Sequence, residues 1–129
     1  MKKQVVVSSK VPLPTAPYSQ AIKVGNLLFV SGQGPFGANG KLVSGDIQAQ
    51  VKQTLENIKS ILLVAGASME DIIKTTVYLR DMRDFEAMNE VYRTFFGKDY
   101  PARSTVQANL AVEGQLVEIE AIAYCPEST

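Results

Sequence analysis

The sequence contains no histidine, and its single cysteine is Cys125. Without histidine, a Ser-His-Asp triad or a Cys-His pair cannot form, and the usual structural zinc sites lose ligands. A lone cysteine cannot form a disulfide within the chain, which favours a reducing compartment. Any acid–base chemistry must therefore depend on carboxylates, tyrosine, lysine or water, and we expect no metal site.

An excess of charge and long apolar runs are also absent. Thirteen Lys and Arg residues balance thirteen Asp and Glu residues, so the chain as a whole does not attract nucleic acid or anionic lipid. No segment approaches the roughly 18 apolar residues that cross a bilayer. The N-terminal apolar run, Val5–Val7, is too short for a signal peptide. We expect a cytoplasmic protein without membrane contact and without nucleic acid as a partner.

Length and hydrophobic periodicity predict one domain spanning residues 1–129. With 46% apolar residues, the chain can bury a core of ordinary size. Alternating and helical apolar spacings predict eight elements. Strands are expected at Val5–Val7, Gln20–Val24, Leu27–Ser31, Ile73–Arg80, Ser104–Ala108 and Leu116–Tyr124, and helices at Asp46–Gly66 and Phe85–Gly97.

Local signals fix several of these boundaries. Gly25-Asn26 is a two-residue hairpin signal between two predicted strands. Asp46 is expected to cap the first helix, and Gly66 to stop it. In the fourth strand, Ile73, Thr75, Val77 and Leu79 are expected on one face, alternating with polar and aromatic residues.

The order β-β-β-α-β-α-β-β predicts an α+β fold with both helices packed on one face of a sheet. Strands such as Leu27–Val30 carry apolar residues on both sides. Two helices on one face leave the other face uncovered, and an exposed apolar sheet promotes association. We therefore expect an oligomer.

Arg103 and Glu120 are the residues with the clearest chemical potential. A guanidinium at the start of a strand can hold a carboxylate in two parallel hydrogen bonds. Glu120 has apolar neighbours in its strand, and a desolvated carboxylate needs a partner or a function. From residue types alone, an ordinary Arg103–Glu120 ion pair is favoured over a catalytic site.

The segments around these residues have a recognisable form. Pro-Ala-Arg-Ser-Thr-Val at residues 101–106, followed by Val-Glu-Ile-Glu-Ala-Ile-Ala at 117–123, resembles the signature of the RidA/YjgF/UK114 family. Further segments match family blocks in order along nearly the whole chain: Ala16–Ala21, Val30–Gln33, Asp46–Gly66, Lys74–Leu79 and Asn89 within 85–96.

The resemblance implies a chorismate-mutase-like fold. It also implies a homotrimer whose sheets face the trimer centre, with ligand clefts between subunits. The implied activity is hydrolysis of reactive 2-imino acids, 2-iminopropanoate and 2-iminobutanoate, to 2-oxo acids and ammonia. No cofactor is implied.

The resemblance also assigns roles to individual residues. Arg103 matches the arginine that grips the substrate carboxylate, and Glu120 the glutamate that positions the attacking water. The backbone of Thr105 should bind substrate; many relatives have Cys at this position, so a thiol nucleophile is not required here. Other matching residues line or support the cleft: Tyr18, Ser31, Gly32 and Asn89.

Other interpretations stay open at this point. Each cleft residue has an ordinary structural alternative, such as packing for Tyr18 or bracing a loop for Asn89. The whole protein could bind 2-oxo acids without catalysis and act in regulation. Relatives have also been described as ribonucleases or translation inhibitors; the balanced charge and lack of histidine argue against that activity.

Overall fold

The computed structural model describes residues 2–126. Their elements follow the predicted order, and short 3-10 turns precede β4 and α2. The bounds are β1 Gln4–Val6, β2 Ala21–Val24, β3 Leu27–Gln33, α1 Ile47–Ala65, β4 Ile72–Leu79, α2 Phe85–Thr94, β5 Ala102–Gln107 and β6 Val117–Tyr124.

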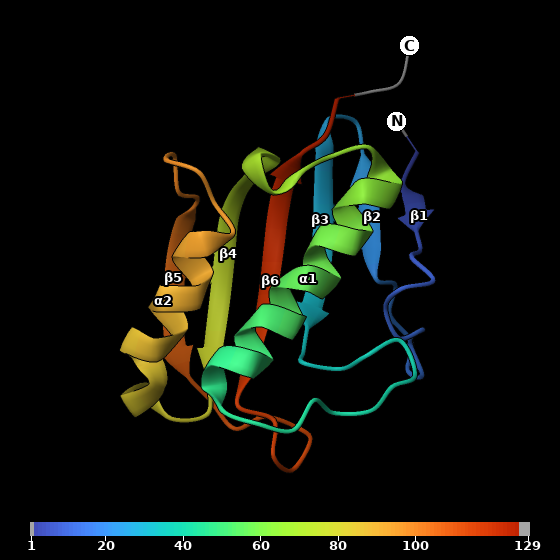
Figure 1. Cartoon of the computed structure of the whole chain (residues 1–129). Helices are drawn as coiled ribbons and strands as arrows, with labels where there is room; N and C mark the ends of the chain where they lie inside the picture. The colour runs from blue at the N-terminus through green and yellow to red at the C-terminus, as the bar shows by residue number, and fades with distance from the viewer. Residues whose placement is uncertain (1, 127–129) are drawn as a thin grey trace.

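The strands form one mixed sheet in the order β1-β2-β3-β6-β4-β5 (Figure 1). Neighbouring strands are antiparallel except β4 and β5, which run parallel. The last strand in the chain, β6, lies between β3 and β4. Residues of β6 therefore occupy the middle of the sheet, whereas β5 is an edge strand.

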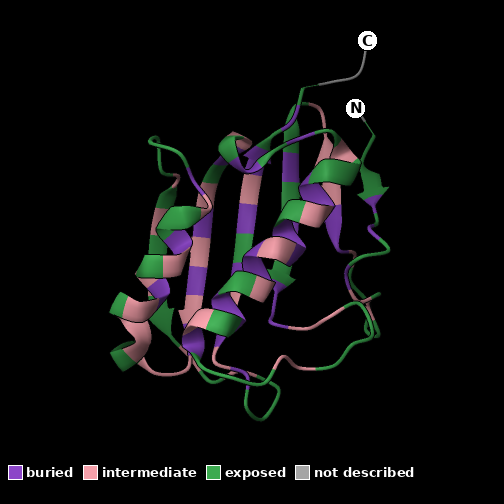
Figure 2. Ribbon diagram, in the orientation of Figure 1, coloured by how far each residue is buried: buried purple, intermediate pink, exposed green. Residues whose placement is uncertain are grey.

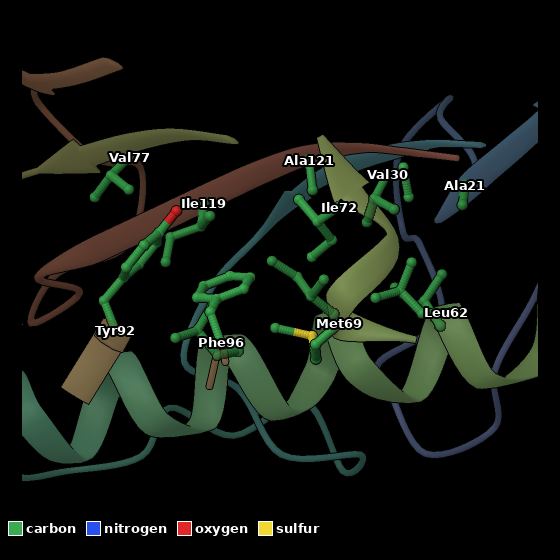
Figure 3. Packing of buried hydrophobic residues seen from close by; sticks show 14 of the residues in the cluster. Ala21, Val30, Leu62, Met69, Ile72, Val77, Tyr92, Phe96, Ile119 and Ala121 are labelled. Carbon is green, nitrogen blue, oxygen red and sulfur yellow. The ribbon is translucent and has the colours of Figure 1, made fainter. Parts of the chain in front are cut away.

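Both helices cover the same face of the sheet, as predicted for the α+β fold (Figure 1). The core lies between this face and the helices, with Leu55 and Ile58 of α1 fully buried opposite strand residues such as Leu28 and Ile119. Figure 3 shows Tyr92 and Phe96, from α2 and the turn after it, reaching into the same core. Within residues 2–126, no helix is long and apolar enough to cross a membrane.

The predicted ends of α1 are confirmed. The Asp46 side chain accepts a hydrogen bond from the backbone N–H of Ala49, which satisfies one of the free donors of the first turn. Gly66 ends the helix with φ of 86°, a left-handed conformation that glycine adopts without steric cost.

The predicted stop of α2 at Gly97 is wrong. The helix ends at Thr94, before Gly97. The N–H groups of Phe95 and Phe96 bond to the carbonyls of Tyr92 and Arg93, three residues back, so the last turn tightens. Phe96 is thereby buried in the core.

The predicted inward position of Ile73 is also wrong. The register between β4 and β6 shifts between Ile72 and Lys74, so one extra residue interrupts the alternation. Ile72 takes the buried position, and Ile73 is 49% exposed. From Thr75 onwards the predicted alternation holds.

The second face of the sheet, which we call the open face, carries no helix of residues 2–126. Buried and more exposed residues alternate along the strands in Figure 2, as expected for a sheet with one covered side. Large apolar side chains remain exposed on the open face: Leu27, Phe29, Val106 and Tyr124. Their presence agrees with the patterning from which we expect an oligomer.

Candidate functional site

Arg103 lies on the covered side of the edge strand β5. In the parallel register with β4, Arg103 is paired with Thr75, which is completely buried beneath α2. Paired residues on neighbouring strands point to the same face. The Arg103 side chain is therefore directed along the edge of the sheet toward α2.

Aromatic and sulfur groups of α2 surround the Arg103 guanidinium. Its central carbon lies 4.8 Å from the ring centroid of Tyr92 and 5.5 Å from that of Phe85. One terminal nitrogen is 3.9 Å from the sulfur of Met88. Such rings attract a cation electrostatically and hold the planar group in place without consuming all its donors.

The Tyr92 ring is itself held in position by a contact with the core. Its hydroxyl shares a 2.7 Å hydrogen bond with the Thr75 hydroxyl in the core. Burial raises the pKa of Tyr92, while the bond to Thr75 and the charge of Arg103 act in the opposite direction. The phenol stays neutral near pH 7, so the ring presents a stable face to the guanidinium.

Arg103 forms no salt bridge with any carboxylate of residues 2–126. It lines an open pocket of about 420 Å³ together with Asn89, Tyr92, Arg93, Tyr100 and Pro101. The lining carries two cations and no acid, which suits an anion. The structure thus brings Asn89 to the same pocket as Arg103.

Thr105 lies two residues beyond Arg103 on the same face of β5, paired with the buried Val77. Its hydroxyl is buried and has no hydrogen-bond partner within the described chain. The hydroxyl therefore points into the protein, and the expected contact through the Thr105 backbone stays a prediction.

Glu120 lies on the open face, in the central strand β6. It is exposed and sits opposite Thr76 of β4. Its Oε1 atom accepts a 2.8 Å hydrogen bond from the hydroxyl of Tyr78. Glu120 is thus presented to the space beyond the sheet.

Glu118 and Gly32 meet on the same face, next to Glu120. A Cβ added to Gly32 would lie 2.5 Å from Oε2 of Glu118, so a larger residue at position 32 would force the carboxylate to move. Burial raises the pKa of Glu118, and the charge of Glu120 adds to this effect, while a bond from Gln115 opposes it. Gly32 thus allows close approach of a carboxyl group.

Ser31 and Tyr18 lie at the β3 end of this region. The Ser31 hydroxyl donates a 2.6 Å hydrogen bond to the carbonyl of Ser19, which ties β3 to the loop before β2. Tyr18, adjacent in that loop, is 54% exposed. Within one chain the Tyr18 side chain is therefore more than half uncovered, and its expected place in the cleft stays a prediction.

Within one chain, the favoured ion pair between Arg103 and Glu120 does not form. Arg103 is paired with Thr75 and Glu120 with Thr76, and consecutive strand residues point to opposite faces. A single chain thus presents two separate groups of candidate residues. The Arg103 group, with Asn89, is on the helix side; the Glu120 group, with Gly32 and Ser31, is on the open face.

Sequence reasoning missed three residues that hold the guanidinium, and the hydroxyl that binds Glu120. Phe85, Met88 and Tyr92 recur at helical spacing, which by itself indicates only that they share one face of a helix. Alternation in β4 places Tyr78 on the same side as Lys74 and Thr76. However, its bond to Glu120 depends on β6 pairing with β4, which no local pattern reveals.

Fold and site together define a small α+β protein with a pocket lined by Arg103 and Arg93 at one sheet edge and a carboxylate, Glu120, on the opposite face. A family described as Endoribonuclease L-PSP matches residues 8–125. The chain belongs to this family, the RidA/YjgF family, as its motifs indicate.

Relatives support the same assignment along the full chain. A RutC family protein from Pyrococcus abyssi is 52% identical, over 96% of this chain and 98% of the relative. A mouse protein named 2-iminobutanoate/2-iminopropanoate deaminase is 42% identical, over 94% of this chain and 90% of the relative.

Solved structures agree. RidA from an Antarctic Psychrobacter superposes with a TM-score of 0.89 at 42% identity, covering 94% of this chain and 98% of that one. Escherichia coli TdcF with bound serine gives 0.88 at 39% identity, with the same coverage.

Proposed function

We propose that this protein is a homotrimeric enzyme that hydrolyses reactive 2-imino acids to 2-oxo acids and ammonia. The observation that carries the proposal is the Arg103 guanidinium, which lies over the rings of Phe85 and Tyr92 and has no carboxylate partner in residues 2–126. A fixed guanidinium open to a pocket is suited to bind the carboxylate of a small acid.

The chemistry requires little beyond this anchor. With its carboxylate on Arg103, an imino acid presents the adjacent C=N carbon to a water held by Glu120. Water adds to that carbon, and its proton passes through Glu120 to the nitrogen, giving a carbinolamine. The hydroxyl proton of the carbinolamine then passes to the nitrogen as the C–N bond breaks, so that ammonia leaves and the 2-oxo acid remains. No metal or organic cofactor takes part in this sequence.

A second copy of the chain must complete the site. Arg103 and Glu120 lie on opposite faces of one sheet, so one chain cannot direct both at the same ligand. In the proposed trimer the open faces turn toward the centre and bury apolar side chains such as Phe29 and Tyr124. The cleft forms where the Glu120 group of one copy meets the Arg103 group of the next.

The names of relatives support the substrate class. Mouse and human relatives are named 2-iminobutanoate/2-iminopropanoate deaminases. E. coli TdcF was crystallised with serine, a small 2-amino acid. We therefore propose 2-iminopropanoate and 2-iminobutanoate as substrates, which dehydratases of serine and threonine release in the cytoplasm.

Two other activities compete with this proposal. The serine in E. coli TdcF equally suits a protein that binds small acids without catalysis. The family description suggests RNA cleavage. Zero formal net charge and the lack of histidine make RNA cleavage the weaker candidate.

A coupled assay tests the proposal. A dehydratase generates the imine from threonine, and the appearance of 2-oxobutanoate is followed with and without this protein. Wild type should accelerate the reaction and Arg103→Ala should not. Arg83→Ala is the matched control, since Arg83 is a surface arginine paired with Asp81.

Each outcome of the assay discriminates between the candidates. No acceleration by wild type, together with measurable binding of 2-oxobutanoate, would favour the binding protein. Cleavage of RNA that disappears in Arg103→Ala would favour the nuclease.

A further inference from the structure

One hydroxyl of the same chain reaches Glu120 on the open face. Tyr78 lies on the neighbouring strand β4, opposite Glu118 and diagonal to Glu120 in the antiparallel register. Its hydroxyl donates a hydrogen bond to Oε1 of Glu120 over 2.8 Å. The bond joins two hydrogen-bonded neighbouring strands, β4 and β6, so the position of the donor is set by the sheet.

The direction of this bond is fixed. The hydrogen bond to Glu120 raises the pKa of Tyr78 above its ordinary value of 10.0, and burial and the charges of Glu120 and Glu118 act in the same direction. The phenol is therefore protonated near pH 7 and donates, while the carboxylate accepts. Oε1 of Glu120 is engaged by Tyr78, which leaves Oε2 for another donor.

A glutamate on an uncovered sheet face would otherwise sample several rotamers. A single anchored oxygen removes much of this freedom and gives the second oxygen a defined direction. Small errors in the position of a reacting water reduce rates strongly, because attack needs an aligned approach to the carbon.

We propose that Tyr78 is a positioning residue for Glu120. It holds the carboxylate in one rotamer and so directs Oε2 at the water that attacks the imine carbon. This inference rests on the function proposed above. It predicts that loss of the hydroxyl affects turnover and leaves substrate binding intact, because Arg103 holds the substrate carboxylate.

The test is Tyr78→Phe, which removes the hydroxyl and keeps the ring. In the coupled imine assay we expect kcat to fall about 10- to 150-fold, the effect of losing one hydrogen bond to a charged group. KM, and the affinity for 2-oxobutanoate, should stay within about twofold of wild type. Tyr124→Phe is the matched control: Tyr124 shares the open face on β6, and no hydrogen bond joins it to Glu120 in the described chain.

A double-mutant cycle shows whether Tyr78 acts through Glu120. Glu120→Ala removes the group to be positioned, so adding Tyr78→Phe to it should change kcat no further. An equal loss in both backgrounds, or wild-type kcat for Tyr78→Phe beside a slow Glu120→Ala, would refute the role of Tyr78 alone. Wild-type turnover by Glu120→Ala would instead overturn the proposed mechanism, and the role of Tyr78 with it.

Discussion

At the scale of single residues, the side chains around Arg103 make its guanidinium suited to bind a carboxylate. Phe85 and Tyr92 stabilise the cation by their ring faces but supply no negative charge. Tyr92 is held by Thr75, so the rings and the guanidinium form a rigid unit. The orientation of the planar guanidinium and its paired N–H donors (the fork) is therefore already fixed before a ligand carboxylate binds. This lowers the entropy lost on binding.

Replacement of Arg103 by lysine tests the geometry of this fork. Lys keeps the charge but loses the planar pair of donors and much of the ring contact. A charge-assisted bidentate pair contributes roughly 2–5 kcal/mol. We expect Arg103→Lys to recover little of the imine hydrolysis that Arg103→Ala loses, measured as kcat/KM in the coupled assay. Recovery to near wild type would show that charge alone suffices.

Thr105 gives a contrasting prediction, because its hydroxyl is buried without a partner in the described chain. Thr105→Ala should keep most activity, as expected for a contact made by the backbone. Thr105→Val should keep activity and unfold at an equal or higher temperature, since it removes an unpaired polar group and preserves the shape. Activity assays and thermal unfolding check both variants. A loss as large as that of Arg103→Ala would place the hydroxyl in the reaction.

At the scale of elements, β6 has two functions: one side of the strand forms part of the core, and the other side carries charged side chains. Its odd-numbered residues from Val117 to Ala123 pack against the helices, while its even-numbered residues carry two carboxylates onto the open face. Gly32 of β3 leaves the room that Glu118 occupies. The strand thus exchanges some stability for a concentration of negative charge at the sheet centre.

This exchange predicts a pH-dependent effect of Glu118→Gln. Burial raises the pKa of Glu118 above its ordinary value of 4.5. A carboxyl with a raised pKa binds its proton more tightly in the folded state. Its contribution to stability is present below pH 4.5 and is lost as the pH rises through the folded-state pKa. Glu118→Gln should therefore unfold at a higher temperature than wild type at pH 7, with the difference vanishing toward pH 4.

Thermal unfolding followed by circular dichroism across this pH range measures the effect. Glu113→Gln is the control, since Glu113 is an exposed carboxylate in the loop before β6. A stabilisation at pH 7 that is equal for the two variants, or absent for Glu118→Gln, would contradict the role of burial.

At the scale of the whole molecule, the Arg103 group and the Glu120 group lie on opposite faces of one chain, so only the association of two copies could bring them together. The open face exposes large apolar side chains, including Phe29 at 42% and Tyr124 at 46%. The same face carries Glu120, whereas Arg103 points the other way. Burial of the face and completion of the site are therefore expected from one association event.

A mixing experiment tests the shared site. Arg103→Ala and Glu120→Gln should each be inactive alone. When the two are co-expressed in equal amounts, about a quarter of the interfaces combine an intact arginine with an intact glutamate, so about a quarter of wild-type activity should return. Light scattering should give about three times the chain mass of 14.0 kDa. A stable monomer, or a mixture as inactive as its components, would exclude a site shared between copies.

The sequence by itself determined the elements and their order, because the signals are local. Apolar spacing identified α1, and Asp46 and Gly66 set its ends through caps that involve only neighbouring residues. The Gly25-Asn26 pair fixed the hairpin of β2 and β3. The family motifs also identified Arg103 and Glu120 as candidates, in segments whose spacing needs no three-dimensional information.

Only the tertiary structure decided which residues share a face. Arg103 and Glu120 separate because β5 pairs in parallel with β4 while β6 enters between β3 and β4, and no local pattern encodes either pairing. An extra residue in a strand changes the face of the side chains on one side of it, as the bulge at Ile73 illustrates by leaving Ile73 exposed and Ile72 buried. The aromatic cradle of Arg103 and the bond between Tyr78 and Glu120 arise from that register, which contacts between distant segments select.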